Sequence, residues 1–121
     1  MGPLARSREA NLLEQQGRIA DAERLWREVL AAGERFAGFA RYRLANLFER
    51  CGRMADAERE WREATAAGDA LARVQLAVVL ERQGRLDEAE QQWRDAAAAG
   101  DPRAEERLAA LVTRRTRTEG S

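Results

Sequence analysis

The sequence contains no lysine and no histidine, and it has only one cysteine and two prolines. All 21 basic residues are therefore arginines, and 21 acidic residues balance them, so attraction to nucleic acid or to an anionic membrane is not expected. A lone cysteine, Cys51, excludes an intrachain disulfide. No apolar run approaches a membrane span, and the first residues lack the apolar core of a signal peptide. These features predict a cytoplasmic protein.

The same scarcities remove most of the side chains that catalysis and metal binding require. Without histidine, a second cysteine or a glycine-rich phosphate loop, the usual nucleophile–base pairs and metal clusters cannot be assembled. We therefore expect no enzyme activity, no catalytic residue, no bound metal and no cofactor.

The residues that are abundant favour helices. Much of the 45% hydrophobic share is alanine, aromatic residues are only 6% of the chain, and β-branched residues are scarce, so helix is favoured over strand. The two prolines, Pro3 and Pro102, lie near the ends. Nothing between them forbids a succession of helices.

The sequence repeats itself. Three segments align without gaps: GRIADAERLWREVLAAG from Gly17, GRMADAEREWREATAAG from Gly52 and GRLDEAEQQWRDAAAAG from Gly84. Their first glycines are 35 and 32 residues apart, which is near the period of repeats built from two helices. The segments LANLFERCG and LAVVLERQG precede the second and third copies, EANLLEQQG precedes the first more loosely, and LAALVTRRT from Leu108 begins a fourth.

Apolar residues within each repeat recur at steps of three and four, which predicts paired amphipathic helices. Gly17, Gly52 and Gly84 are expected to end each first helix, and Gly33, Gly68 and Gly100 each second helix, in the left-handed conformation that glycine adopts most easily. Asp69 and Asp101 are predicted N-caps, with Pro102 in the first helical turn. The predicted helices are 4–16, 20–32, 36–51, 55–67, 70–83, 87–99 and 102–114.

Residue size also repeats. Small side chains share one register of the first helices and one of the second, which allows two helices to approach closely: Ala10, Ala45, Ala77 and Ala109, then Ala22, Ala57 and Ala89. A tryptophan follows each turn glycine by nine residues, at Trp26, Trp61 and Trp93. We expect these rings to fill the space toward the next repeat, each contributing roughly 3–5 kcal/mol.

This pattern resembles the tetratricopeptide repeat family. The third repeat carries the family's small, leucine, glycine, small, aromatic and small positions as Ala77, Leu80, Gly84, Ala89, Trp93 and Ala96. The AAGD junctions ending at Asp69 and Asp101 are also similar to those of Sel1-like repeats. In two respects the sequence departs from the pattern. Arginine stands at the usual aromatic position early in each first helix, at Arg6, Arg41 and Arg73, and the proline usual between repeats is replaced by an acidic residue.

The resemblance implies an all-α fold, a right-handed α-solenoid of three helix-turn-helix repeats plus a C-terminal capping helix. The repeat domain is expected to span 1–115, with repeats at about 4–33, 34–68 and 69–100 and the capping helix at 101–114. Residues 115–121 have no apolar stripe and are predicted to form a disordered basic tail. Polar residues at inner-repeat apolar positions, such as Ser7, Glu9 and Glu106, predict solubilising caps at both ends.

The resemblance further implies that the first helices line a concave groove that binds a protein or peptide. The implied lining residues are Ser7, Asn11, Glu14 and Gln15, then Tyr42, Asn46, Glu49 and Arg50, then Val74, Val78, Glu81 and Arg82. Asparagine amides at Asn11 and Asn46 suit a peptide backbone, and Tyr42 offers an amphipathic platform. The predicted function is a protein-interaction scaffold that holds an extended segment or a partner helix in this groove.

Two charge patterns have plainer interpretations than catalysis or ligand binding. Glu14, Glu49 and Glu81 share one register and are expected to form a solvated or arginine-paired row. Three glutamate–arginine pairs in i,i+4 order are expected to decorate exposed helix faces, at about 0.2–0.5 kcal/mol each: Glu23/Arg27, Glu58/Arg62 and Glu90/Arg94.

A structural role remains open beside the binding role. Leu25, Leu30, Phe36 and Phe39 are apolar where the third repeat has no match, so the chain could instead be a self-associating module, a homo-oligomer with no dedicated peptide ligand. The three extra residues around Phe36 and Gly38 are either a self-docking element or a longer helix.

Overall fold

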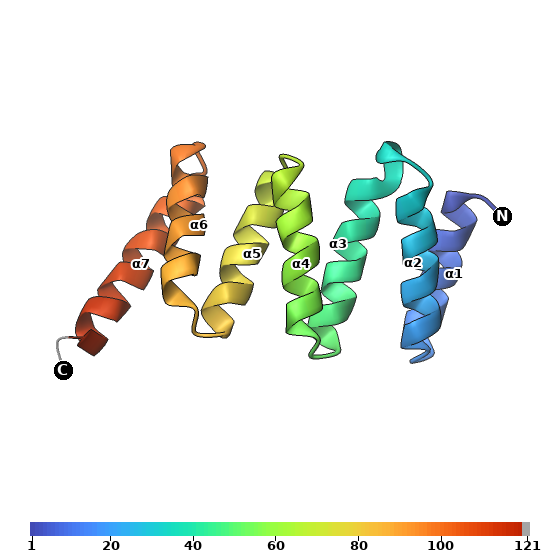
Figure 1. Cartoon of the computed structure of the whole chain (residues 1–121), viewed down its shortest axis with the longest axis horizontal. Helices are drawn as coiled ribbons and strands as arrows, with labels where there is room; N and C mark the ends of the chain where they lie inside the picture. The colour runs from blue at the N-terminus through green and yellow to red at the C-terminus, as the bar shows by residue number, and fades with distance from the viewer. Residues whose placement is uncertain (120–121) are drawn as a thin grey trace. The chain divides into compact units, whose positions relative to one another are not determined.

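The computed structural model describes residues 1–119, which contain seven helices and no strand (Figure 1). The helices are α1 (Pro3–Gln15), α2 (Ile19–Ala31), α3 (Glu34–Arg50), α4 (Met54–Ala66), α5 (Ala70–Arg82), α6 (Leu86–Ala98) and α7 (Pro102–Glu119). Every boundary lies within two residues of its prediction except the end of α7. The extra residues in the second repeat simply lengthen a helix, because α3 has 17 residues where α1 and α5 have 13.

The turn glycines end the helices as predicted. Gly84, for example, has a φ of +74°, and the N–H of the next residue, Arg85, bonds the carbonyl of Leu80 at 2.9 Å. All six predicted turn glycines have positive φ, and no other described residue does. A β-carbon is strained in this conformation, which explains why glycine recurs at each of these positions.

Both predicted aspartate caps form. A side-chain oxygen of Asp69 accepts the backbone N–H groups of Leu71 and Ala72, at 3.0 and 3.2 Å. Asp101 accepts the backbone N–H of Arg103 at 2.9 Å. Each carboxylate thereby satisfies donors that a helix N-terminus leaves unpaired.

The chain forms two compact units, Met1–Ala64 and the residues from Thr65 onward, called here the N-terminal and C-terminal units. In the N-terminal unit α1 packs on α2 and α2 on α3, around Trp26 and the fully buried Ala10, Ala22 and Ala45. In the C-terminal unit α5 packs on α6 and α6 on α7, around Trp93 and the fully buried Ala77 and Ala89. The predicted alternation of small and large residues is therefore the packing that builds each core.

The prediction that α7 ends at 114 and gives way to a disordered tail is wrong for residues 115–119, which continue the helix. The reason is an interaction that the apolar pattern does not show. Arg115 donates to Glu90 of α6 at 2.8 Å and also to Asp87, and the Thr116 and Thr118 hydroxyls bond carbonyls four residues earlier. Residues 120–121 of the predicted tail lie outside the described residues.

Two of the three predicted i,i+4 ion pairs form, Glu58 with Arg62 at 2.9 Å and Glu90 with Arg94 at 3.1 Å. In the first repeat both members have other partners. Arg27 bonds Glu60 of α4, and Glu23 accepts Arg53, because longer contacts between hairpins compete with the local pair. None of the helices within residues 1–119 is both long enough and apolar enough to span a membrane.

Candidate partner-binding face

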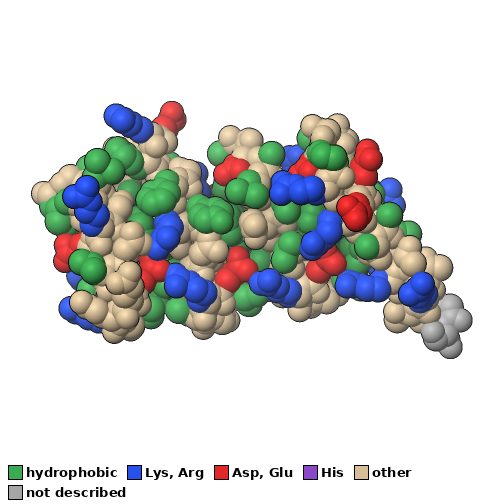
Figure 2. Space-filling view, turned by 180° about the vertical axis from the view of Figure 1, so that it is seen from behind, with side chains coloured by type: hydrophobic (Ala, Val, Ile, Leu, Met, Phe, Trp, Pro, Cys, Tyr) green, Lys and Arg blue, Asp and Glu red, His purple; other side chains and the backbone are tan. Residues whose placement is uncertain are grey.

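The helices called here A helices, α1, α3, α5 and α7, are the first helices of the hairpins and of the terminal half-repeat. They carry the predicted groove residues. On the face shown in Figure 2, arginines and carboxylates alternate with hydrophobic side chains. The two units are described separately below, beginning with the feature that both share.

A hydrogen bond from tryptophan to glutamate recurs in every repeat. The indole Nε1–H of Trp26 donates to Glu14 at 2.6 Å, that of Trp61 to Glu49 at 2.9 Å, and that of Trp93 to Glu81 at 2.7 Å. Each bond joins an A helix to its partner helix in the same hairpin. The predicted row of glutamates is thus built into the hairpins, and its members also satisfy the polar atoms of buried rings.

Glu14 is the centre of a charged cluster in the N-terminal unit. Its side chain is only 3% exposed, and its carboxylate accepts Arg43 at 3.4 Å and Arg50 as well as Trp26. Arg43 also donates to the amide oxygen of Asn11 and lies over the Trp26 ring, 5.2 Å from its centroid. The predicted residues Asn11, Glu14 and Arg50 are therefore brought together, and Arg43, which sequence reasoning missed, joins them.

Tyr42 and Asn46, two further predicted residues of α3, make different contacts. The Tyr42 ring meets the Trp61 ring edge to face, with centroids 5.4 Å apart, and remains exposed at its outer side. The Asn46 amide donates to the Tyr42 carbonyl at 3.0 Å, so it is already engaged by its own helix. Phe39 makes a similar edge contact with Trp26 at 5.6 Å and is half exposed.

The C-terminal unit repeats the glutamate–arginine pairing. Glu81 accepts Arg114 of α7 at 3.2 Å, as well as Trp93. Arg114 has the same repeat register as Arg50, which bonds Glu14. Of the other predicted residues here, Arg82 is exposed and Val78 is half-buried. The row is arginine-paired at Glu14 and Glu81, as expected, and the tryptophan donors are the part that was missed.

A pocket of about 370 Å³ opens among the A helices of the C-terminal unit, lined by Val74, Trp93, Arg103, Glu106 and Arg107. Arg107 lies over the Trp93 ring, 5.1 Å from its centroid. In the N-terminal unit, Phe39 occupies the corresponding place above Trp26. The residue of α7 in the same repeat register as Phe39 is Arg103. An apolar floor with a mostly basic rim suits an apolar side chain next to a carboxylate.

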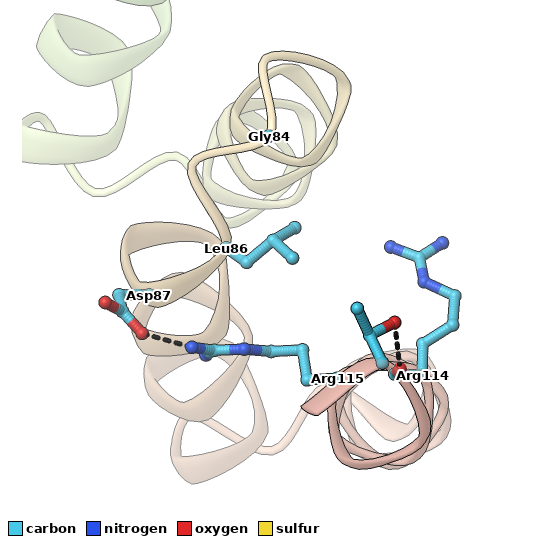
Figure 3. A pocket seen from close by; sticks show the side chains of 6 residues that line it. Gly84, Leu86, Asp87, Arg114 and Arg115 are labelled. Carbon is cyan, nitrogen blue, oxygen red and sulfur yellow. Dashed lines mark hydrogen bonds and ion pairs between the residues drawn. The ribbon is translucent and has the colours of Figure 1, made fainter. Parts of the chain in front are cut away.

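A second pocket of about 280 Å³ lies at the C-terminal end of α7 (Figure 3). Leu86 and Asp87 of α6 face Arg114 and Arg115 across it, and the Arg115 side chain reaches Asp87. Two of its lining residues, Arg115 and Thr118, lie beyond the predicted helix end, so the sequence did not indicate it.

Several predicted positions are not available to a partner. Ser7 is buried, and its hydroxyl donates to the Pro3 carbonyl at 2.8 Å. Leu25, expected on a self-association surface, is buried in the N-terminal unit. In place of these, the A helices expose Phe39 and Leu71, which the groove prediction did not include. Their shared register with Leu4, apolar in all three repeats, was the signal that could have found them.

No cluster of three or more histidine, cysteine, aspartate or glutamate side chains within residues 1–119 is arranged to hold a metal ion.

The comparison with known proteins settles the family. A sequence model described as "Tetratricopeptide repeat" matches residues 7–61 and 42–105. The chain belongs to the tetratricopeptide repeat family. The likeness of its AAGD junctions to Sel1-like repeats stays a prediction, and no curated protein matches the sequence.

Solved structures show the same helical repeat fold. The first tetratricopeptide domain of the human RPAP3 protein is 18% identical, with 99% of each chain covered and a TM-score of 0.69. The first such domain of Spaghetti (RPAP3), bound to the HSP90 peptide SRMEEVD, is 16% identical over 92% of this chain and 90% of that one, with a TM-score of 0.67. The second domain of human RPAP3, in complex with the HSP70 peptide SGPTIEEVD, is 17% identical over 91% and 98%, with a TM-score of 0.65.

Proposed function

We propose that this tetratricopeptide repeat protein is an interaction scaffold that binds an extended peptide or a partner helix along its A helices, without a catalytic role. The observation that carries the proposal is the exposure of Phe39, Tyr42 and Leu71 on α3 and α5. The tryptophan rings beneath the two aromatic side chains are buried, so these side chains are the accessible part of the aromatic layer. Large exposed apolar side chains next to arginines are typical of surfaces that bind proteins.

The arrangement of charges restricts the chemical class of peptide that this face can bind. Glu14 and Glu81 are neutralised by arginines and by indole donors, so they offer little to a cationic peptide. Arg50 and Arg114 are both more than half exposed, so they keep donors for a second acceptor. A peptide with an apolar residue beside a carboxylate fits this pattern best. The peptides in the similar RPAP3 complexes contain such residues.

The experiment is quantitative capture of partners from the native host with the wild-type chain, Tyr42→Ala and Asn46→Ala. Arg24→Ala is the matched control, because this exposed residue lies on α2, which is not an A helix. We expect both A-helix variants to lose partners that the control retains, with the larger loss for Tyr42→Ala. Retention of every partner by both variants would show that the A-helix assignment is wrong.

Self-association is the second candidate, and the half-exposed Phe39 is the observation that favours it. Light scattering over a range of concentrations tests it directly. A monomer at the highest concentration removes this candidate, whereas a dimer that Phe39→Ser dissolves would put it first.

A further inference from the structure

The face of α1 that carries Arg8 and Leu12, called here the outer face, has counterparts in α3 and α7. The repeat register that aligns Ala10 with Ala45 and Ala109 also aligns Leu12 with Leu47 and Leu111. The same register aligns Arg8 with Arg43 and Arg107. Three A helices thus present an arginine and, one turn later, a leucine at the same place.

In α3 and α7 this arginine and leucine pack against a helix that carries a tryptophan. The Arg43 guanidinium lies 5.2 Å from the centroid of Trp26 in α2, and that of Arg107 lies 5.1 Å from the centroid of Trp93 in α6. The accompanying leucines, Leu47 and Leu111, are each 1% exposed. Cation–π attraction and burial of an apolar side chain therefore act together in both places.

In α1 the same two side chains are exposed and have no tryptophan-bearing helix of the described chain packed on them. Leu12 is 55% exposed, Leu4 and Met1 nearby in the sequence are each 65% exposed, and hydrophobic side chains are visible at this end of the chain in Figure 2. Within residues 1–119, Arg8 makes no hydrogen bond or ion pair. The prediction of a solubilising cap rested on Ser7 and Glu9 and did not include Leu12, an exposed apolar side chain of the same helix.

We infer that the outer face of α1 binds an amphipathic helix of another protein, one that places a tryptophan over Arg8 and buries Leu12 under apolar side chains. The partner would make the same contacts that Trp26 and Trp93 make at α3 and α7, a cation–π contact with the arginine and burial of the leucine. Neither Arg8 nor Leu12 is among the residues of the proposed peptide-binding face, so the two proposals can fail independently.

A second copy of the folded chain is not the occupant. Trp26, Trp61 and Trp93 are at most 1% exposed, so a folded copy has no accessible tryptophan to offer.

The probe is a synthetic peptide of residues 84–100, acetylated, amidated and fluorescently labelled, which carries Trp93 in a sequence that already pairs with Arg107 and Leu111 in the chain. Fluorescence anisotropy should show saturable binding to the full chain. Because binding at the outer face uses both side chains, Leu12→Glu should weaken binding by about tenfold or more and Arg8→Gln by about threefold. Val112→Glu, which adds the same charge at an exposed apolar residue of α7, is the matched control and should bind as the wild type does.

A tryptophan-free peptide, with Trp93→Ala, should lose about tenfold or more in affinity. Because isolated helices of this length are marginal, a fusion in which residues 70–101 precede Pro3 provides a second measurement. Asp101 has the register of Gly2, so the added hairpin enters in phase. Its thermal unfolding midpoint should exceed that of the unfused chain, and Leu12→Glu should cancel the gain.

Three results would overturn the inference. They are binding that Leu12→Glu leaves unchanged, a fusion with no gain in unfolding midpoint, and light scattering that shows a dimer dissolved by Leu12→Glu. The last would assign the outer face to a second copy instead.

Discussion

Arg27 on α2 donates to the carboxylate of Glu60 on α4 at 2.6 Å, and the Glu60 side chain is 1% exposed. The same register holds Leu25 in the first repeat and Gln92 in the third, so a charge stands where the other repeats have neutral residues. The Arg27 guanidinium also lies 5.9 Å from the centroid of the Phe48 ring. One arginine therefore both neutralises the buried carboxylate and covers an aromatic ring.

Removing Arg27 should lower the stability of the fold more than replacing Glu60 with an apolar residue. Arg27→Ala leaves a buried carboxylate without its cation and should lower the free energy of unfolding by about 2–3 kcal/mol, a figure reduced because Arg27 is partly exposed. Glu60→Leu restores the residue of the first repeat and should be neutral or stabilising. Urea denaturation measures both, and an equal loss for the two variants would contradict this account.

The stability that each tryptophan–glutamate bond contributes should depend more on the presence of an acceptor oxygen than on the negative charge of the glutamate. Glu81→Ala leaves the Trp93 indole N–H without its acceptor and should cost about 1–3 kcal/mol. Glu81→Gln keeps an oxygen in reach and should cost less, losing mainly the pairing with the exposed Arg114. Thermal unfolding followed by circular dichroism compares the two. Arg114→Ala is the control for the ion pair, and a loss as large as that of Glu81→Ala would assign the effect to charge.

Acid should weaken the start of α7 through Asp101. The Arg103 side chain and backbone N–H both bond the Asp101 carboxylate and hold its pKa below its ordinary value. A carboxylate with a depressed pKa stabilises the fold above the unfolded pKa of about 3.9, and this contribution is lost as the pH falls through the lower folded value. Wild-type stability should therefore drop more between pH 5 and about 2.5 than that of Asp101→Asn, as urea midpoints would report. Parallel pH curves for the two proteins would contradict the assignment.

The last turn of α7 should depend on Arg115. Its side chain reaches Glu90 and Asp87, so Arg115→Ala should free residues 115–119 and raise their amide exchange rates by about tenfold, since the bonds joining them to α6 are lost. Exchange in α5 should not change. Arg24→Ala, which removes an exposed arginine with one ion pair on α2, serves as the control. Unchanged exchange near the end of α7 would show that helix propensity alone holds it.

The sequence was informative wherever one hairpin determines its own structure. Glycine, alanine and tryptophan recur at fixed offsets, so the helices, their ends and the buried residues followed from local rules. The errors arose where side chains reach between hairpins. Arg27, Arg43 and Arg115 each take partners at least 25 residues away, and no periodic pattern records which of several arginines will do so. The constant twelve-residue spacing from glutamate to tryptophan was visible in the sequence, yet only the folded hairpin shows that it is a hydrogen bond.

The three indole–carboxylate bonds also give the protein a set of optical reporters. Each repeat contains a single buried tryptophan whose N–H is bonded to an acceptor in the same hairpin. Replacing any two of these rings with phenylalanine leaves one tryptophan, whose emission reports on one hairpin alone. Melting curves of the three single-tryptophan proteins would then show whether the hairpins come apart together or in succession.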